Sequence, residues 1–304
     1  MFPASMPSPT AGVIHLGPLP IRGYALCILL GIVVAVWLTD RRLRDRGGEP
    51  GQVLDVAAYA VVSGIIGGRI YHVITTPEPY WGDGGHPLNA LKIWQGGLGI
   101  WGAVALGAVG AWVGCRKAGV RYLDFADAAA PGILVAQGIG RWGNWFNNEL
   151  YGGPTGLPWG LEIHKWDASA GRAVTDANGD AIIQGIYHPT FLYEALFVML
   201  LALVLLVIER RRPLAPGQLF GLYIAGYPLG RIIIEKMRTD DAELILGQRL
   251  NVWTSIIVFL IGVAIVLHTG RRGRRNTTIP GATKSPDDAV PPNDTEAPAS
   301  SSTM

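Results

Sequence analysis

The chain has 304 residues, of which 49% are hydrophobic and 16% are charged, and its formal net charge is +2. Soluble domains contain about 25% charged residues, so this composition excludes a typical soluble protein. The small net charge also argues against a nucleic-acid partner, and we expect none.

Apolar runs follow one another along the chain. They lie at 21–39, 53–74, 97–115, 123–140, 189–208, 218–235 and 250–268. Each approaches or reaches the roughly 20 residues with which a helix crosses about 30 Å of hydrocarbon. A buried core helix of a soluble protein is the alternative for any one run, but so many long runs are rare in a globular chain. The sequence therefore predicts an all-α polytopic membrane protein with about seven transmembrane helices.

Basic residues alternate between the two sides of this predicted membrane domain. Clusters follow the first, third, fifth and seventh runs, at 41–46, 116–121, 210–212 and 271–275. Because cytoplasmic loops carry an excess of Lys and Arg, we expect the N-terminus outside and the C-terminus in the cytoplasm. Residues 1–20 lack the basic start and the cleavage site of a signal peptide, so we interpret them as a retained extracytoplasmic segment.

Two longer segments lie outside the runs. Residues 149–187 contain an Asn178-Gly179 turn signal between Val174 and Ile182, which is typical of a hairpin, and we expect a small extracytoplasmic cap there. Residues 276–304 contain almost no large apolar side chain, so we expect a disordered cytoplasmic tail. The membrane domain itself is expected to span 21–268.

Several segments resemble known binding motifs, but their sequence context argues against those motifs. The spacing G-x-G-x-x-G at 97–102 enters an apolar run, so we interpret its glycines as a close helix contact and not as a dinucleotide loop. The segment beginning at Asp176 resembles a calcium loop, but Ala181 stands where that loop needs Gly. The six His residues show no metal-ligand spacing, so we expect neither a metal nor a cofactor. Cys27 and Cys115 are expected at different depths of the bilayer and not in a disulfide.

Polar residues gather at the outer ends of the predicted spans. They are Arg22, Tyr24, Arg69, His72, Gln95, Arg141, Asn144, His188, Tyr193, Glu194, Arg231 and Glu235. Ionisable groups at membrane depth cost several kcal/mol unless they are paired or face a wet cavity, so the cluster predicts a functional site. Taken singly, Arg22 or Arg69 is equally well explained as a snorkelling side chain or a structural ion pair.

The sixth run and the residues just after it place four polar or ionisable side chains on one helical face. Tyr227, Arg231, Glu235 and Arg238 recur at helical spacing. The planar guanidinium fork binds two phosphate oxygens and stays charged in a low-dielectric site, which indicates an anionic lipid head group as ligand. A transporter of anionic solutes or lipids would use similar residues, although its site usually lies near the bilayer midplane. A scaffold role leaves the charges without a purpose.

Residues 140–152 read G-R-W-G-N-W-F-N-N-E-L-Y-G. This run resembles the signature of prolipoprotein diacylglyceryl transferases, G-R-x-G-N-F-x-N-x-E-x-x-G, with Trp145 in the aromatic place. Further matches to the family are 22–24, 68–69, 94–97, 188–190, 192–194, 226–227 and the residues Arg231, Glu235 and Arg238. The likeness covers roughly 15–268.

The resemblance implies an enzyme of the bacterial plasma membrane. It would move the diacylglyceryl group of phosphatidylglycerol to the lipobox cysteine of prolipoproteins, forming a thioether and releasing glycerol phosphate. Arg141 and Arg231 would hold the lipid phosphate, Tyr24 and Asn144 would make polar contacts, and two carboxylates would fix the arginines. The remaining residues implied for the site are Glu149, Glu235, Gly152, Arg238, Tyr227, Gln95 and His188, the first two being those carboxylates.

One position departs from the family. Many members carry a His-Gly-Gly run whose His is proposed as the base, and here that slot is Trp101. A thiol of pKa about 8.5 is already a few per cent thiolate at pH 7, so full deprotonation would gain only roughly thirty-fold, about 2 kcal/mol. One well-placed electrostatic group is worth about 3 kcal/mol or more in a transition state. We therefore expect the arginines to dominate catalysis, with the thiol proton taken by water, the lipid phosphate or a nearby carboxylate.

Overall fold

Long helices occupy the positions of the apolar runs. The computed structural model describes residues 5–17, 19–240 and 244–271, and within them seven helices have 18 residues or more. They are α1 (Gly23–Arg44), α2 (Gln52–Thr75), α4 (Ile100–Lys117), α5 (Tyr122–Asn147), α6 (Thr190–Arg211), α7 (Gln218–Met237) and α8 (Leu250–Arg271). The tail predicted at 276–304 lies outside the described residues.

The apolar character of these helices differs. By length and composition, α1, α2, α6 and α8 are suited to cross a membrane. The other three fall outside this group: α4 has only 18 residues and ends in Arg116 and Lys117, and α5 and α7 contain ionisable side chains. The chain is thus a helical membrane protein with several apolar helices.

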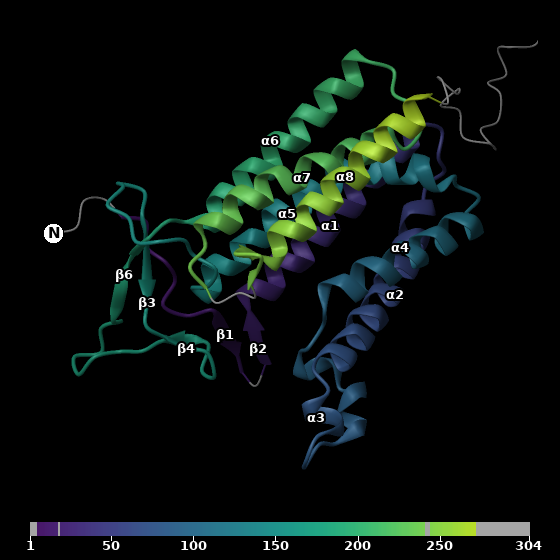
Figure 1. Ribbon diagram of the computed structural model, residues 1–304. Helices are drawn as coiled ribbons and strands as arrows, with labels where there is room; N and C mark the ends of the chain where they lie inside the picture. Colours follow the sequence, from purple (N-terminus) through teal and green to yellow (C-terminus); the bar gives the residue numbers. More distant parts are fainter. Residues whose placement is uncertain (1–4, 18, 241–243, 272–304) are drawn as a thin grey trace, which may run out of the picture.

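The helices pack as antiparallel neighbours. In Figure 1, α1 and α5 to α8 run side by side, whereas α2 and α4 form a pair that diverges from them. The main contacts join α2 to α4, α1 to α5 and α7 to α8, and α5 also touches α6 and α7. Helix α5 is therefore central, and its buried run of small residues at 126–132 lets its neighbours approach closely.

Glycine makes the contact between α2 and α4 possible. A Cβ atom on Gly102 would lie 2.1 Å from the carbonyl oxygen of Gly67, and one on Gly110 would lie 2.5 Å from that of Tyr59. The helix contact predicted from the glycines at 97–102 is confirmed at Gly102. Cys27 and Cys115 are free thiols on α1 and α4, as expected.

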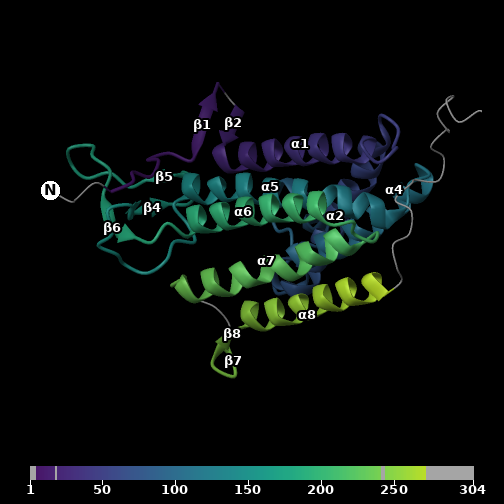
Figure 2. The same cartoon turned by 90° about the horizontal axis from the view of Figure 1, so that it is seen from above.

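Short antiparallel strand pairs lie at one end of the helices (Figures 1 and 2). In the described part of the chain each sheet has two strands, paired β1–β2, β3–β6, β4–β5 and β7–β8. The strands are β1 (Val13–Leu16), β2 (Leu19–Arg22), β3 (Leu161–His164), β4 (Trp166–Asp167), β5 (Arg172–Ala173), β6 (Ile183–Tyr187), β7 (Leu244–Ile245) and β8 (Gln248–Arg249). The chain is therefore mostly helical, as predicted, with short strands outside the long helices.

The hairpin predicted around Asn178-Gly179 is confirmed. The backbone N–H of Ile182 donates to the carbonyl of Val174 at 2.9 Å, and Thr175 pairs with Ala181. The supposed calcium residue Asp176 instead accepts hydrogen bonds from backbone N–H groups of this turn. The hairpin β1–β2, by contrast, falls where the predicted N-terminal segment meets the first apolar run, and the sequence indicated no strand there.

Arg69 organises the connection between α2 and α4. This segment contains α3 (Glu78–Trp81), η1 (Pro87–Leu91) and η2 (Ile93–Gln95). The buried Arg69 guanidinium donates to the carbonyl oxygens of Asn89 at 2.6 Å, Ala90 at 2.7 Å and Gly96 at 2.6 Å. Of the interpretations left open for Arg69, the structural one is thus supported, although its partners are carbonyl groups and not a carboxylate.

Candidate functional site

A buried carboxylate joins three helices at the end that carries the hairpins. Glu194, in the second turn of α6, is 3% exposed. Its Oε1 lies 2.7 Å from Nη2 of Arg141 on α5, and its Oε2 lies 3.3 Å from Nη1 of Arg231 on α7. The Tyr227 hydroxyl donates to Oε1 at 3.1 Å. Burial of an unpaired carboxylate would cost several kcal/mol, so these partners are what allow Glu194 to stay inside the helices.

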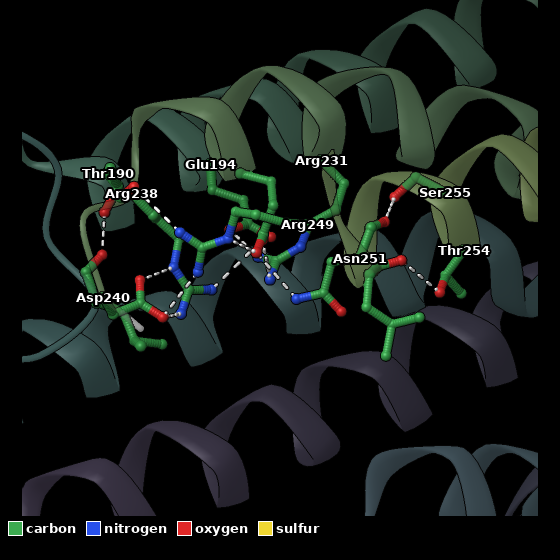
Figure 3. Close-up of polar contacts among 12 residues, drawn as sticks. Thr190, Glu194, Arg231, Arg238, Asp240, Arg249, Asn251, Thr254 and Ser255 are labelled. Carbon is green, nitrogen blue, oxygen red and sulfur yellow. Dashed lines mark hydrogen bonds and ion pairs between the residues drawn. The ribbon is translucent and has the colours of Figure 1, made fainter. Parts of the chain in front are cut away.

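A second buried carboxylate, Glu235, also pairs with Arg231. Glu235 on α7 has no exposed surface, and its Oε2 lies 2.9 Å from Nη2 of Arg231. Its Oε1 lies 2.8 Å from Nε of Arg249 and accepts a hydrogen bond from Asn251 at 3.0 Å. Arg231 is therefore held between two carboxylates. Figure 3 shows it in one polar network with Glu194, Arg238, Asp240 and Arg249.

The segment after α7 closes this network. The carboxylate of Asp240 accepts hydrogen bonds from Arg238 at 2.7 Å and from Arg249 at 3.0 Å. Burial by itself would raise the pKa of Asp240, but its hydrogen bond to Arg238 and the charges of both arginines hold that pKa below its usual value. Acidic and basic groups thus alternate from Asp240 to Arg141.

A small pocket opens in front of the network. Its polar lining is Arg141, Asn144, Thr190, Glu194, Arg231 and Arg238. Three guanidinium groups and one carboxylate leave an excess of positive charge. Among the described residues Arg231 also pairs with Glu235, and Arg238 pairs with Glu235 and Asp240. Arg141, which pairs with Glu194, therefore keeps the most N–H donors for a ligand. This set of donors suits the oxygens of a phosphodiester, which accept bidentate hydrogen bonds from arginine. The space itself, about 10 Å³, holds about one water, so the side chains must move apart to admit a phosphate.

A profile of the family described as prolipoprotein diacylglyceryl transferase matches residues 11–268, most of the chain. The chain belongs to this family.

Relatives in the family match most of this chain. A phosphatidylglycerol–prolipoprotein diacylglyceryl transferase of Paenarthrobacter aurescens is 52% identical over 277 residues, which cover 91% of this chain and 87% of the relative. A protein of Streptomyces coelicolor with the same name, numbered 2, is 52% identical over 269 residues, covering 88% and 82%. One from Streptomyces griseus is 51% identical over 285 residues, covering 93% and 84%.

The structure brings together much of the predicted site of this family member. Arg141, Asn144, Arg231 and Arg238 line one pocket, and the Glu235 carboxylate supports it from behind. Tyr227 contacts Glu194 and so also belongs to the network.

Gly152 and His188 hold neighbouring backbone segments. The Gly152 N–H donates to the carbonyl of His188 at 2.9 Å, and Gly152 also pairs with Arg238. A Cβ atom on Gly152 would lie 2.9 Å from Cβ of His188 and 3.0 Å from the carbonyl oxygen of Met237, so no larger residue fits. Nδ1 of His188 lies 3.2 Å from the Tyr193 hydroxyl. Both residues position the chain beside the pocket without lining it.

Four predicted or discussed positions do not line this pocket. Tyr24 on α1 is 43% exposed and packs against Gly143, and Trp101 at the start of α4 is 45% exposed. Gln95 ends η2, and its side chain is outside the described atoms. Glu149 is exposed and accepts hydrogen bonds from Asn144 at 3.1 Å and Asn147 at 3.0 Å.

The partner of Arg141 differs from the expected one. The resemblance implied that Glu149 and Glu235 fix the two arginines, but the carboxylate beside Arg141 is Glu194. Arg249 is a second supporting residue that the sequence did not indicate. Glu194 stood among the polar residues of the fifth run, yet nothing in the sequence indicated which arginine it would face, because that depends on the rotation of α6 against α5 and α7.

Proposed function

We propose that this protein transfers the sn-1,2-diacylglyceryl group of phosphatidylglycerol to the lipobox cysteine thiol of prolipoproteins, the first step of lipoprotein maturation. The thiol sulfur forms a bond to the glyceryl carbon, the bond from that carbon to the phosphate oxygen breaks, and glycerol phosphate leaves. The observation that carries the proposal is the pocket of three guanidinium groups around Glu194, in a member of this family.

The arginines stabilise the leaving group. A phosphodiester carries one negative charge, and the departing phosphate gains a second as the carbon–oxygen bond breaks. Donors set in advance around the pocket stabilise this growing charge more than they stabilise the bound lipid, which is the condition for lowering a barrier. Arg141 and Arg231 act on the phosphate, and Glu194 and Glu235 hold them in place.

The other predicted residues take supporting roles. Asn144 and Glu149 form a hydrogen-bonded pair beside the pocket and contact the reacting groups. Tyr24 contributes a polar contact from α1. The residues assigned to substrate binding and its positioning are Arg238, Tyr227, Glu235, Gly152, Gln95 and His188.

The thiol loses its proton without a histidine at position 101. Trp101 has no proton acceptor, and a free thiol is already a few per cent thiolate at pH 7. The proton passes to water, the lipid phosphate or a nearby carboxylate. Electrostatic stabilisation of the leaving group therefore contributes more than base catalysis.

The seven long helices all cross the bacterial plasma membrane. The N-terminus and residues 149–187, the small cap, lie outside, residues 21–268 form the catalytic domain, and the tail at 276–304 lies in the cytoplasm. Support comes from the last turns of α1, α4, α6 and α8, which carry basic residues at the end of the helices opposite the pocket.

Mass spectrometry tests the proposal. The purified protein in detergent is incubated with phosphatidylglycerol and a lipobox peptide, with a Cys→Ser peptide as control. We expect the mass of the cysteine peptide to increase by a diacylglyceryl group and glycerol phosphate to appear in equal amount. Protein that binds phosphatidylglycerol but yields no thioether would contradict the enzyme and support a lipid transporter instead.

A further inference from the structure

A second and larger pocket lies outside the helices. Its volume is about 500 Å³, within the range of about 300–1,000 Å³ typical of ligand sites. Three elements enclose it: the β1–β2 hairpin, the end of α5 and the turn between β4 and β5. The residues that matter here are Arg22, Asn147, Glu149, Ser169, Ala170 and Gly171.

One hydrogen bond connects the two pockets. Asn144 lines the arginine pocket and Glu149 lines the second one, and Nδ2 of Asn144 donates to Oε1 of Glu149 at 3.1 Å. A ligand in the second pocket therefore lies next to a ligand in the arginine pocket. A reaction between two substrates needs this proximity, because the thiol must reach the carbon attached to the phosphate.

The two pockets differ in charge. The arginine pocket has three guanidinium groups and one carboxylate, whereas the second has one of each, Arg22 and Glu149. Among the described residues Arg22 takes part in no ion pair or side-chain hydrogen bond, and Glu149 in no ion pair, so both keep hydrogen-bonding capacity for a ligand. A guanidinium donates to carbonyl groups and a carboxylate accepts from N–H groups. A polypeptide backbone offers both kinds of group and carries no net charge, which matches one guanidinium and one carboxylate. A phosphodiester is negatively charged and is better matched by the excess of guanidinium groups in the arginine pocket.

The wall opposite α5 leaves room for a polypeptide chain. Residues 168–171 form the β4–β5 turn, and their small side chains occupy little of the pocket. The acyl chains of a lipid need the apolar helices, and this pocket lies among the hairpins instead.

We propose that the second pocket binds the acceptor polypeptide in an extended conformation, at the residues that follow the cysteine. The inference rests on the proposed function, since it names the subsite of the thiol substrate. A second phospholipid head group is the competing occupant. If the pocket binds the polypeptide, filling it weakens use of the peptide substrate. If it binds a phospholipid head group, filling it weakens use of phosphatidylglycerol.

Filling the pocket with a side chain tests the inference. In Ala170→Trp an exposed turn residue that lines the pocket becomes bulky, and in Ala177→Trp the same change is made in the neighbouring turn, away from the pocket. Two lipobox peptides are compared, one ending at the cysteine amide and one extended by six residues. We expect Ala170→Trp to raise the KM of the long peptide about tenfold, to that of the short one, and to leave the KM of phosphatidylglycerol unchanged. Ala177→Trp should change neither.

Other outcomes would overturn the inference. If Ala170→Trp and Ala177→Trp behave alike with the long peptide, or if Ala170→Trp raises the KM of phosphatidylglycerol, the pocket does not hold the polypeptide. Ala168→Trp, which fills the same pocket, replaces Ala170→Trp if the latter fails to fold.

A binding measurement separates this inference from the proposed function. Fluorescently labelled long peptide is titrated with each variant in the absence of lipid. Loss of binding in Ala170→Trp alone supports the pocket even if no thioether forms, whereas absence of thioether with the wild-type protein contradicts only the enzymatic proposal. Equal binding by all variants contradicts the pocket.

Discussion

Glu194 and Arg141 form an ion pair of 2.7 Å between α6 and α5, with Arg231 on the other side of the same carboxylate. The pair fixes the guanidinium at the pocket before any lipid arrives. Donors held in place in advance need little reorganisation during reaction, which is what makes electrostatic catalysis effective. Glu194 is thus central to the proposed mechanism even though it does not contact the reacting bonds.

Glu194→Gln should lower kcat/KM about 10- to 100-fold, because an uncharged side chain orients Arg141 and Arg231 poorly, and tenfold corresponds to about 1.4 kcal/mol. Initial rates of lipid transfer give the value. Glu209→Gln is the matched control, since Glu209 pairs with Arg42 and Arg46 at the other end of α6. Equal losses in both variants would mean that Glu194 contributes only stability.

Arg249→Gln should reduce kcat/KM about tenfold, a loss of about 1.4 kcal/mol, without a matching change in the KM of the peptide. Glu235 would lose one of its close partners and hold Arg231 less firmly. Arg249→Lys should restore part of the rate, because a charge remains beside Glu235. A variant with wild-type kinetics but a lower Tm would show that Arg249 stabilises the fold and does not position Arg231.

Trp101→His should raise the rate by no more than roughly thirty-fold, the full gain available from deprotonating a thiol at pH 7. The variant is compared with the wild type at saturating phosphatidylglycerol. A gain of several hundred-fold would show that proton transfer limits the reaction and that the arginines are not the main contribution.

Asp240→Asn should lower stability at pH 7 by less than about 1 kcal/mol, since the Asp240 side chain is 36% exposed and water partly screens its ion pairs. The arginines depress the pKa of Asp240 in the folded state. Its stabilising contribution is therefore present above the unfolded pKa of about 3.9 and is lost as the pH falls through the lower folded pKa. Thermal unfolding should show a difference from the wild type at pH 7 that shrinks toward pH 3. A difference independent of pH would contradict the assignment.

The positions of the helices could be predicted from the sequence better than their ends. The fourth run was expected to end at residue 140, where Arg141 interrupts the apolar pattern, but α5 continues to Asn147. The ion pair with Glu194 satisfies Arg141 and lets the helix extend. The hydropathy of a segment reflects only the residues within that segment, so it could not indicate that Arg141 would pair with Glu194 on another helix.

The site could be predicted by residue type but not by pairing. Arg141 and Arg231 are indicated by the unusual position of charged groups at membrane depth, and Arg238 by its helical spacing from Arg231. The structure places all three on one pocket. Arg141 pairs with Glu194 and not with Glu149. This pairing depends on which sides of α5 and α6 are in contact. The β1–β2 hairpin was missed because its apolar strands run directly into the first span, so no polar break separates strand from helix.

The most direct test of the central claim is transfer of labelled diacylglyceryl to a lipobox peptide by Arg141→Ala and Arg231→Ala in detergent, at equal protein levels. The account predicts that each variant loses at least about a hundred-fold in kcat/KM, close to the 3 kcal/mol of one electrostatic group. Near wild-type transfer by either variant would contradict it.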